Sequence, residues 1–245
     1  MLNEVALRVW KRVPEEWRPA VRRARGQVSR LLAPYTRTRA MWGVGAFSVR
    51  WGWDRGLPIH RFYVERFMEK SSSLIRGHCL EFQEDLYATR FGKGIQKLDI
   101  LHIDESNPKA TIVADLTAPN EIPSDTFDCI ICTHVLHVIK KYPAVVSEMH
   151  RILRPGGVLL VCVPQSSMCL PEYGELWRFT AEGMRTVLAD VFGISSVVVE
   201  SYGNSLVSAA ELRGLVSEEF TRGELLRQDS RFALEVCARA TKAAQ

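Results

Sequence analysis

The 245-residue sequence lacks any apolar run of the ~20 residues that a membrane-spanning helix needs. The N-terminus also lacks a continuous apolar segment of the kind that directs secretion. Together these absences predict a cytoplasmic protein with no transmembrane segment. With 47% hydrophobic and 24% charged residues, the composition is that of an ordinary globular protein, and nothing in it indicates disorder.

Acidic residues are scarce at the start of the chain. Residues 1–56 contain 12 Lys or Arg against 4 Asp or Glu, a charge of +8, whereas the rest contains 20 against 24, a charge of −4. A basic segment can bind nucleic acid, anionic lipid or an acidic partner. It can equally form an amphipathic helix that packs on its own domain, and the sequence leaves these interpretations open.

Cysteine is present, but not in a pattern typical of a metal site. The six cysteines mostly lie in apolar, strand-like runs, so we expect buried thiols. Cys129 and Cys132 have the C-x-x-C spacing of redox and zinc motifs. They fall within one predicted strand, where residues three apart point to opposite faces, so we predict no metal.

Short hydrophobic runs separated by polar connectors occupy residues 77–164. They are too short for buried helices and rich in β-branched residues, which is typical of strands covered on both faces. Three of these runs end in an acid, namely Glu81, Asp104 and Asp115. The sequence therefore predicts three carboxylates at the carboxyl edge of a parallel sheet, where open α/β sheets bind ligands. The runs are residues 78–82, 97–104, 110–116, 127–132 and 158–163.

The remaining hydrophobic patterns predict helices and two further strands. We expect the strands at residues 196–201 and 232–238 to form an antiparallel hairpin at the sheet edge. Thr180 is a predicted helix cap, because a threonine side chain can accept a bond from the first turn. The predicted helices are residues 60–75, 142–153, 181–191, 206–220 and 221–227.

The N-terminal segment carries apolar residues at helical spacing over residues 4–12 and 15–32, including Leu7, Trp10 and Trp17. Such tryptophans either contact a membrane surface or pack on the parent domain. The following loop, residues 41–58, is rich in glycine and tryptophan, which is typical of a binding loop or lid. We therefore expect a basic helical extension at 1–58 and one α/β domain at 59–245.

Several motifs occur in an order that resembles the class I S-adenosylmethionine-dependent methyltransferases. This resemblance implies a doubly wound, mostly parallel seven-stranded sheet with an antiparallel C-terminal hairpin and an N-terminal helical extension. It also implies S-adenosylmethionine as the cofactor. The motifs are Leu80-Glu81, Asp104, Ala114-Asp115-Leu116, Phe127-Asp128, Leu136-His137 and Leu153-Arg154-Pro155-Gly156-Gly157.

Three more segments are similar to a bacterial subgroup often found beside or fused to glycosyltransferases. They are Pro58-Ile59-His60-Arg61-Phe62-Tyr63, Tyr87-Ala88-Thr89-Arg90-Phe91-Gly92 and Trp177-Arg178-Phe179-Thr180. This resemblance implies methyl transfer to a small-molecule hydroxyl, on a sugar or a glycosylated metabolite. Nucleic acid is not the expected substrate, because no Asn-Pro-Pro-Tyr-like segment follows the fourth strand.

The chain departs from the subgroup at two places. Gln83, Glu84 and Asp85 stand where a glycine-rich turn would let the backbone approach a cofactor closely, and His60 stands where aspartate is usual. One alternative is therefore a methyltransferase-like binding or partner protein that has lost cofactor use. We expect binding, because the Asp104 and Asp115 positions remain.

The resemblance assigns roles to the strand-end acids. Asp104 would accept hydrogen bonds from the ribose hydroxyls, Asp115 with Leu116 would flank the adenine, and Glu81 would face the ammonium. Their structural alternatives are a loop cap, a turn and a salt bridge to arginine, respectively. The full predicted cofactor set is Glu81, Phe82, Gln83, Tyr87, Asp104, Asp115, Leu116 and Thr133.

Candidates for a general base are the three histidines His134, His137 and His60, because imidazole titrates near neutral pH. Each has an alternative role in packing or in orienting the substrate. We expect an acceptor pocket with an aromatic wall and arginine, and a homo-oligomer or partner contact through the N-terminal extension. The predicted acceptor set is Arg61, Tyr63, Trp177, Arg178 and Tyr202.

Overall fold

The computed structural model describes residues 13–244. The predicted helix at 4–12, with Leu7 and Trp10, lies outside them. The described chain forms two compact units made of interleaved segments. The first contains residues 13–62, 166–168 and 203–234, and the second contains residues 63–165, 169–202 and 235–244.

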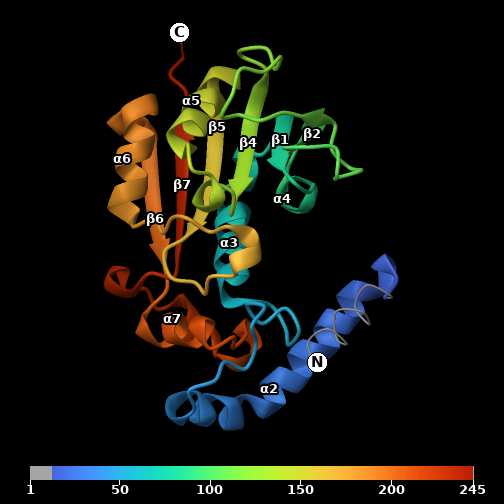
Figure 1. Ribbon diagram of the computed structural model, residues 1–245, viewed down its shortest axis with the longest axis vertical. Coiled ribbons are helices and arrows are strands. Elements are labelled where there is room, and N and C mark those ends of the chain that lie inside the picture. The colour runs from blue at the N-terminus through green and yellow to red at the C-terminus, as the bar shows by residue number, and fades with distance from the viewer. Residues whose placement is uncertain (1–12, 245) are drawn as a thin grey trace. The chain divides into compact units, whose positions relative to one another are not determined.

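A seven-stranded sheet runs through the second unit of the described chain (Figure 1). Its strand order is β3-β2-β1-β4-β5-β7-β6. The first five strands in this order are parallel to one another, and β7 runs antiparallel between β5 and β6. This confirms the predicted fold class. The strands are β1 Gly77–Phe82, β2 Ile95–His102, β3 Ile112–Val113, β4 Phe127–Thr133, β5 Leu153–Pro164, β6 Val197–Tyr202 and β7 Glu235–Thr241.

Helices lie on both sides of this sheet. Thr180 caps α6 as predicted, because its Oγ1 accepts a 3.0 Å hydrogen bond from the Gly183 amide. The helix α3 begins in the first unit and ends in the second. The α-helices are α3 Ile59–Lys70, α4 Leu86–Phe91, α5 Tyr142–Ile152 and α6 Ala181–Phe192, and the 3-10 turns are η2 Ser72–Leu74, η3 Leu136–Val138, η4 Pro171–Tyr173 and η5 Ile194–Ser196.

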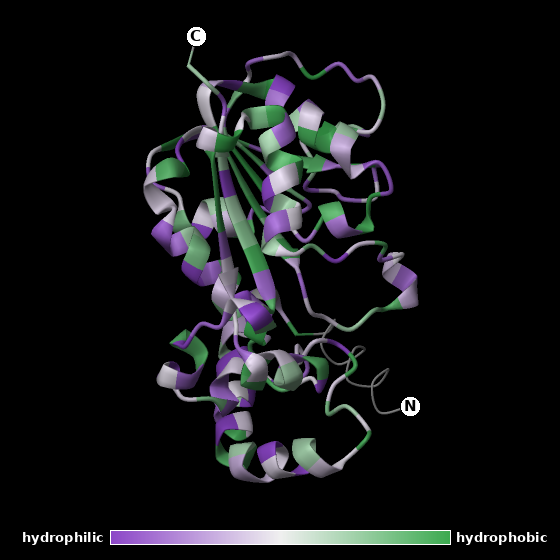
Figure 2. Ribbon diagram, turned by 90° about the vertical axis from the view of Figure 1, so that its left-hand side faces the viewer, coloured by the Kyte–Doolittle hydropathy of each residue, from purple (hydrophilic) through white to green (hydrophobic). Residues whose placement is uncertain are grey.

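The main hydrophobic core lies between the sheet and the helices α5 and α6. It joins Ile130 and Val161 of the central strands to Met149 of α5 and Leu188 of α6, all fully buried. The strands form the most continuous hydrophobic stretches, whereas the helices alternate between hydrophobic and hydrophilic residues (Figure 2). This pattern is expected of an amphipathic helix that covers a sheet.

The first unit contains the long helix α2, Arg18–Trp42, together with α7, Ser205–Leu212, and α8, Arg222–Leu226. The prediction that the N-terminal helix ends at residue 32 is wrong, since α2 continues through Pro34. Proline removes one backbone hydrogen bond. Beyond it, Thr36 donates to Glu219 and Arg37 pairs with Glu224 at 2.7 Å, which holds the last turns in place. The 3-10 turns are η1 Glu15–Trp17, η6 Ser217–Glu219 and η7 Ser230–Phe232.

Several other boundaries differ from the prediction; for example, β5 begins at Leu153 and not at residue 158, and β2 ends at His102 and not at residue 104. The helix expected over 206–220 ends at Leu212, because Gly214 has φ +70° and a Cβ there would meet the Ser48 backbone at 2.4 Å. The last strand begins at residue 235, since the residues before it form η7. The strand expected over 110–116 is two residues long, since β3 is an edge strand that pairs only with the end of β2.

All six cysteines lie within the described residues and are free, and five of them are buried, as predicted. Cys169 is exposed. Between residues 13 and 244, no group of three or more potential metal ligands comes together. No helix in the same range has the length and apolar character needed to cross a bilayer.

Candidate functional site

The parallel strands bring their carboxyl ends to one edge of the sheet. Strand β1 pairs Phe82 with Leu101 of β2, and β2 pairs His102 with Val113 of β3. Asp104 and Asp115 each follow two residues after the His102–Val113 pair. Both predicted acids therefore follow neighbouring strands at the same edge of the sheet.

The turn after β1 has a glycine-like backbone although its residue is glutamine. Gln83 has φ +68°, a left-handed conformation that favours glycine. The Glu84 amide donates 2.9 Å to the Phe82 carbonyl, which closes a tight γ-turn around Gln83. Asn107 donates to the Gln83 carbonyl at 2.5 Å and holds this turn. The chain thus forms a sharp bend after β1 although no glycine is present in this turn.

Glu81 caps the helix α4. Its two carboxylate oxygens accept from the amides of Tyr87 and Ala88 at 2.9 and 2.7 Å, and the residue is 2% exposed. Burial raises the pKa of Glu81 to about 7, against the opposing effect of these two hydrogen bonds. The arrangement is not a salt bridge to arginine, and the expected contact with the cofactor's ammonium, direct or through water, stays a prediction. It uses the acid to hold the first turn of α4 beside the sheet edge.

Asp104 and Asp115 are both exposed at this edge. The side chain of Asp104 is 62% exposed, and hydrogen bonds from Ser106 lower its pKa. The Thr117 amide donates to Asp115 Oδ1 at 2.8 Å and lowers the pKa of Asp115. Both groups are therefore carboxylates at neutral pH. Exposed carboxylates are suitable acceptors for vicinal hydroxyls and for an exocyclic amine, so this pair of acceptors fits an adenosine group.

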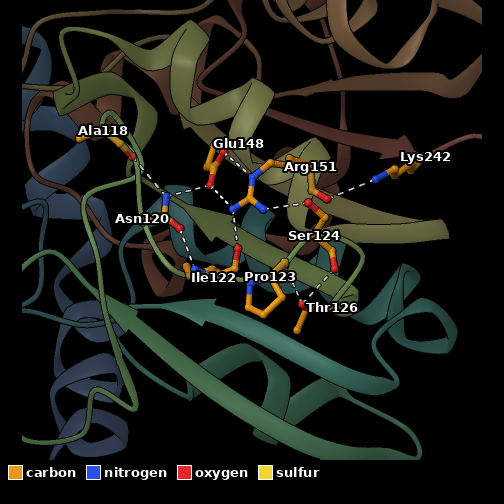
Figure 3. A network of polar contacts seen from close by, with 9 residues as sticks. All are labelled: Ala118, Asn120, Ile122, Pro123, Ser124, Thr126, Glu148, Arg151 and Lys242. Carbon is orange, nitrogen blue, oxygen red and sulfur yellow. Dashed lines mark hydrogen bonds and ion pairs between the residues drawn. The ribbon is translucent and has the colours of Figure 1, made fainter.

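A polar network holds the segment that follows Asp115 (Figure 3). Arg151 of α5 donates to the Ile122 carbonyl at 2.6 Å and pairs with Glu148 at 2.5 Å. Glu148 in turn accepts from Asn120 at 2.8 Å. This segment connects β3 to β4 without a helix, and the network fixes its path between Ala118 and Thr126 (Figure 3).

Asp115 also borders a cavity of about 680 Å³. Its other walls come from the residues between Ala114 and Phe127 and from polar side chains of the sheet, including His78 and Asp99. Asp104, Gln83 and Thr133 do not line it. Of the predicted cofactor residues, Asp115 alone is part of its lining.

His134 follows the end of β4 and forms a dyad with a buried acid. Its Nε2 lies 2.8 Å from Oε1 of Glu235, which is fully buried at the start of β7. His134 has φ +53°, and its amide donates to the Cys162 carbonyl at 2.8 Å. Glu235 was not among the predicted site residues. The available signal was an acid inside the apolar run 233–238, because an isolated charge is rarely placed in a buried strand.

The other two candidate histidines have different surroundings. His137 is 8% exposed, and its ring centroid lies 6.0 Å from that of His134. Burial, and secondly the nearby His134, lower the pKa of His137 to about 4, and no described residue bonds to its Nδ1. His60 belongs to the first unit, where it is buried with Nδ1 2.5 Å from Glu211. The structure thus brings together His134 and His137.

The predicted acceptor residues fall into three groups. Trp177 and Arg178 share one loop of the second unit, where Trp177 donates to the Ile139 carbonyl at 3.0 Å and Arg178 pairs with Glu175. Tyr63 and Tyr202 are buried and stack with ring centroids 5.7 Å apart. Arg61 belongs to the first unit and lies over the ring of Trp53.

The remaining predicted cofactor residues border the same sheet edge. Phe82 ends β1 and Thr133 ends β4, both partly buried. Tyr87 lies in the first turn of α4 and is 2% exposed, and Leu116 is 6% exposed. The strand-end set is thereby placed on adjoining elements of one unit.

Comparison with known proteins adds a family match. A family model described as a methyltransferase domain matches residues 52–216. A demethylmenaquinone methyltransferase of Lysinibacillus sphaericus is 34% identical over 73 residues, which are 30% of this chain and 31% of that protein. The match therefore spans under a third of that relative's length.

Several solved structures share the fold. They include a chain from the complex of a Haloferax volcanii methyltransferase activator with a methyltransferase, with a TM-score of 0.52, 13% identity, and coverage of 76% of this chain and 91% of that one. A Thermotoga maritima S-adenosylmethionine-dependent methyltransferase has a TM-score of 0.51, 15% identity, and coverage of 75% and 91%. A further S-adenosylmethionine-dependent methyltransferase, from Archaeoglobus fulgidus, has a TM-score of 0.50, 13% identity, and coverage of 77% and 96%. At these identities the likeness concerns the fold.

Proposed function

Because the chain belongs to the S-adenosylmethionine-dependent methyltransferases, we propose that it methylates a hydroxyl of a small molecule, a sugar or a glycosylated metabolite. The cofactor of this family, S-adenosylmethionine, supplies a methyl group that is already activated on a sulfonium. The protein then has two tasks, namely to align the acceptor and to remove the hydroxyl proton.

We assign cofactor binding to the strand-end acids. Asp104 would accept from the two ribose hydroxyls and Asp115 from the adenine amine, in keeping with their exposure and lowered pKa values. The left-handed Gln83 supports this assignment, because its γ-turn leaves the backbone bent at the end of β1. Glu81 would act indirectly by fixing α4.

The base in this proposal is His134, and its dyad with Glu235 is the observation that supports O-methylation most. The buried carboxylate, 2.8 Å from Nε2, would keep the proton on that nitrogen. The other ring nitrogen would then take the proton from the acceptor hydroxyl, and Glu235 would stabilise the resulting imidazolium. His137 is a weaker candidate, since its pKa of about 4 makes it a poor base at neutral pH.

We assign the acceptor wall to Trp177 and Arg178. An aromatic ring can pack on the face of a sugar, and a guanidinium can bind a carboxylate or phosphate on it. Trp177 is 40% exposed, which leaves part of its ring available for such packing. Arg178 already pairs with Glu175, so an anionic acceptor would compete with that carboxylate.

A second candidate acceptor follows from the partial relative, which is named a demethylmenaquinone methyltransferase. That name suggests a quinone ring, whose two carbonyls become phenolic hydroxyls when the quinone is reduced. A dyad such as His134–Glu235 would deprotonate a phenolic hydroxyl more easily than a sugar hydroxyl, because the phenol is the stronger acid.

An activity assay distinguishes the candidates. Purified protein and S-adenosylmethionine are incubated with nucleotide-linked sugars, with phenolic glycosides and with 1,4-dihydroxy-2-naphthoate. Formation of S-adenosylhomocysteine and of the methylated product is measured by mass spectrometry. We expect O-methylated sugar products, and a His134→Ala loss of about 10²–10⁴-fold in kcat, as is typical of a general base. Asp190→Ala, on the exposed face of α6, is the control.

Two results would overturn the proposal. Methylation of the naphthoate ring alone, with no sugar product, would reject the sugar acceptor. Failure to bind S-adenosylhomocysteine at all would favour the alternative of a binding protein without cofactor use.

A further inference from the structure

Helix α2 exposes its large apolar side chains and buries small or polar ones, the reverse of the usual arrangement in a helix that covers a domain. The residues that it buries are small or polar, namely Gly26, Ser29 and Thr36. Its large apolar residues are exposed, with Leu31 at 81% and Tyr35 at 62%. A helix that only covered its own domain would bury the large apolar side chains.

The exposed apolar residues form one continuous stripe, which we call the α2 stripe. Val28, Leu31, Leu32 and Tyr35 have the spacing i, i+3, i+4 and i+7, which places them on one side of a helix. Trp17 and Trp42 extend the same side at its two ends, 62% and 82% exposed. The α2 stripe consists of Trp17, Val28, Leu31, Leu32, Tyr35 and Trp42, all exposed.

The buried side of α2 is anchored within the first unit. The Ser29 hydroxyl donates to the Arg55 carbonyl at 2.9 Å, and Thr36 donates to Glu219 at 2.5 Å. The Glu218 side chain lies so close to Gly26 that a Cβ there would meet it at 2.4 Å. These contacts fix the rotation of the helix, so the α2 stripe faces away from the segments that hold it.

The charge of α2 is entirely positive. Its 25 residues include seven arginines and neither Asp nor Glu. Arg39 is exposed within the stripe, on the side shared by Val28 and Leu32, whereas Arg23 and Arg30 are exposed on the side of the helix turned away from it. An apolar stripe with tryptophan at its ends, on a helix whose only charged residues are arginines, is the composition of a helix that lies in the interface of an anionic bilayer.

We propose that the α2 stripe docks the protein on a membrane surface that contains anionic lipid. The helix would lie parallel to the membrane, with the stripe among the acyl chains and Arg39 at the headgroup phosphates, while the other arginines add to the attraction by the anionic surface. The two tryptophans would sit at the polar boundary, where their ring N–H groups find acceptors. This inference does not depend on which acceptor the enzyme methylates.

Other occupants fit the same surface less well. A second copy of α2 would bring two all-positive helices together, and their charges would repel. Nucleic acid would pair with the arginines but leave the aliphatic Val28, Leu31 and Leu32 without apolar contacts. Anionic lipid can contact the apolar side chains with its acyl chains and attract the arginines with its headgroups.

Co-sedimentation of the full chain with vesicles tests the proposal. Vesicles of phosphatidylcholine with phosphatidylglycerol are compared with vesicles of phosphatidylcholine alone, at low and high salt. We expect binding to the anionic vesicles that weakens with salt. Leu31→Ser with Tyr35→Ser should reduce the partition coefficient by about tenfold or more, since both side chains lose apolar area that would be buried. Arg39→Glu should also reduce it, because this arginine lies within the stripe and would meet the anionic headgroups.

The control is Val198→Ser, which removes an apolar side chain that is 43% exposed on β6. It should bind vesicles as the unaltered protein does. Unchanged thermal unfolding temperatures show that all the variants fold. The proposal is overturned by absence of binding to anionic vesicles, or by binding that the stripe variant does not reduce. It is also overturned if the protein is a dimer that the stripe variant dissociates, or if an RNA or DNA oligonucleotide displaces it from the vesicles.

Discussion

Two residues at the carboxyl edge of the sheet, Gln83 and His134, have left-handed backbones that few non-glycine residues adopt. Such conformations cost free energy and persist where the surrounding structure holds them in place. The Gln83 turn is held by Asn107, and His134 is held by Cys162 and Glu235. Their occurrence together at the proposed site supports its functional assignment.

The first prediction concerns Glu235. Because this acid contacts His134 and not the acceptor, it is a positioning residue, and Glu235→Gln should lower kcat by about 10–100-fold with KM nearly unchanged. The pH at which kcat reaches half its maximum should also fall, because the imidazolium loses its carboxylate partner. A variant with lower thermal stability but an unaltered pH profile would instead give Glu235 a purely structural role.

The second prediction concerns His137 and acid stability. Its folded-state pKa of about 4 lies below the ordinary 6.5, so between these values the unfolded chain binds a proton that the folded chain does not. Stability from His137 is therefore present above pH 6.5 and is lost as the pH falls toward 4. Relative to His137→Leu, the native protein should lose about 2–3 kcal/mol between pH 7 and pH 4.5.

Urea unfolding of both proteins at the two pH values measures this difference. Glu81, whose raised pKa works in the opposite direction, is present in both proteins and cancels. Equal losses of stability in the two proteins would show that His137 does not titrate as described.

At the residue level, the sequence indicated the acids and histidines but not their partners. Asp104 and Asp115 were predictable because each follows a hydrophobic run that ends at the same sheet edge. The Glu235 partner of His134 was not, since 101 residues separate them. Likewise, the capping of α4 by Glu81 depends on where the chain turns after Gln83, which no local pattern specifies.

At the level of elements, the turn between β1 and α4 shows how residues 83–85, none of them glycine, form the sharp bend expected of a glycine-rich turn. The Gln83 amide donates to the Leu101 carbonyl at 3.0 Å and so extends the pairing of β1 with β2 by one residue. The γ-turn then reverses the chain, and Glu81 accepts the first amides of α4. Backbone hydrogen bonds therefore replace the conformational freedom that glycine would supply.

The third prediction tests this turn with two substitutions. Gln83→Gly removes the cost of a left-handed side chain, about 1–2 kcal/mol, and adds the entropy cost of glycine, about 0.5–1 kcal/mol. We expect the free energy of unfolding to stay equal or rise slightly, and the affinity for S-adenosylhomocysteine to be retained or improved. Gln83→Val, the matched β-branched variant, should be less stable and bind more weakly. A destabilised glycine variant would show that the glutamine side chain itself supports the site.

Strands were the elements that the sequence predicted best, because uninterrupted β-branched runs identify buried strands. The ends of helices were predicted less well. Helix α2 passes through Pro34 because distant contacts to Glu219 and Glu224 hold its last turns. Helix α7 stops at Leu212 because Gly214 packs against the Ser48 backbone. In both cases tertiary contacts override local propensity.

At the level of the whole molecule, the described chain divides into two units, and the amino-acid composition does not mark where one ends and the other begins. The segment 203–234 lies between β6 and β7 of the sheet, yet it belongs with the N-terminal residues. Its acids explain this, since Glu219 accepts from Thr36 and pairs with Arg55, and Glu224 pairs with Arg37. The sequence showed the excess of positive charge at residues 1–56, but it did not show that Glu219 and Glu224 pair with two of these arginines. The role of residues 1–58 as a lid stays a prediction.

The central claim is that the strand-end acids of the second unit hold the adenosyl group, and calorimetric titration with S-adenosylhomocysteine tests it most directly. The account predicts saturable binding at one site per chain. It predicts affinity lower by about 10–100-fold for Asp104→Ala, because a charged acceptor of the ribose hydroxyls is lost, and no change for Asp190→Ala. Absence of binding at millimolar ligand, or an Asp104→Ala variant that binds as tightly as the unaltered protein, would contradict it.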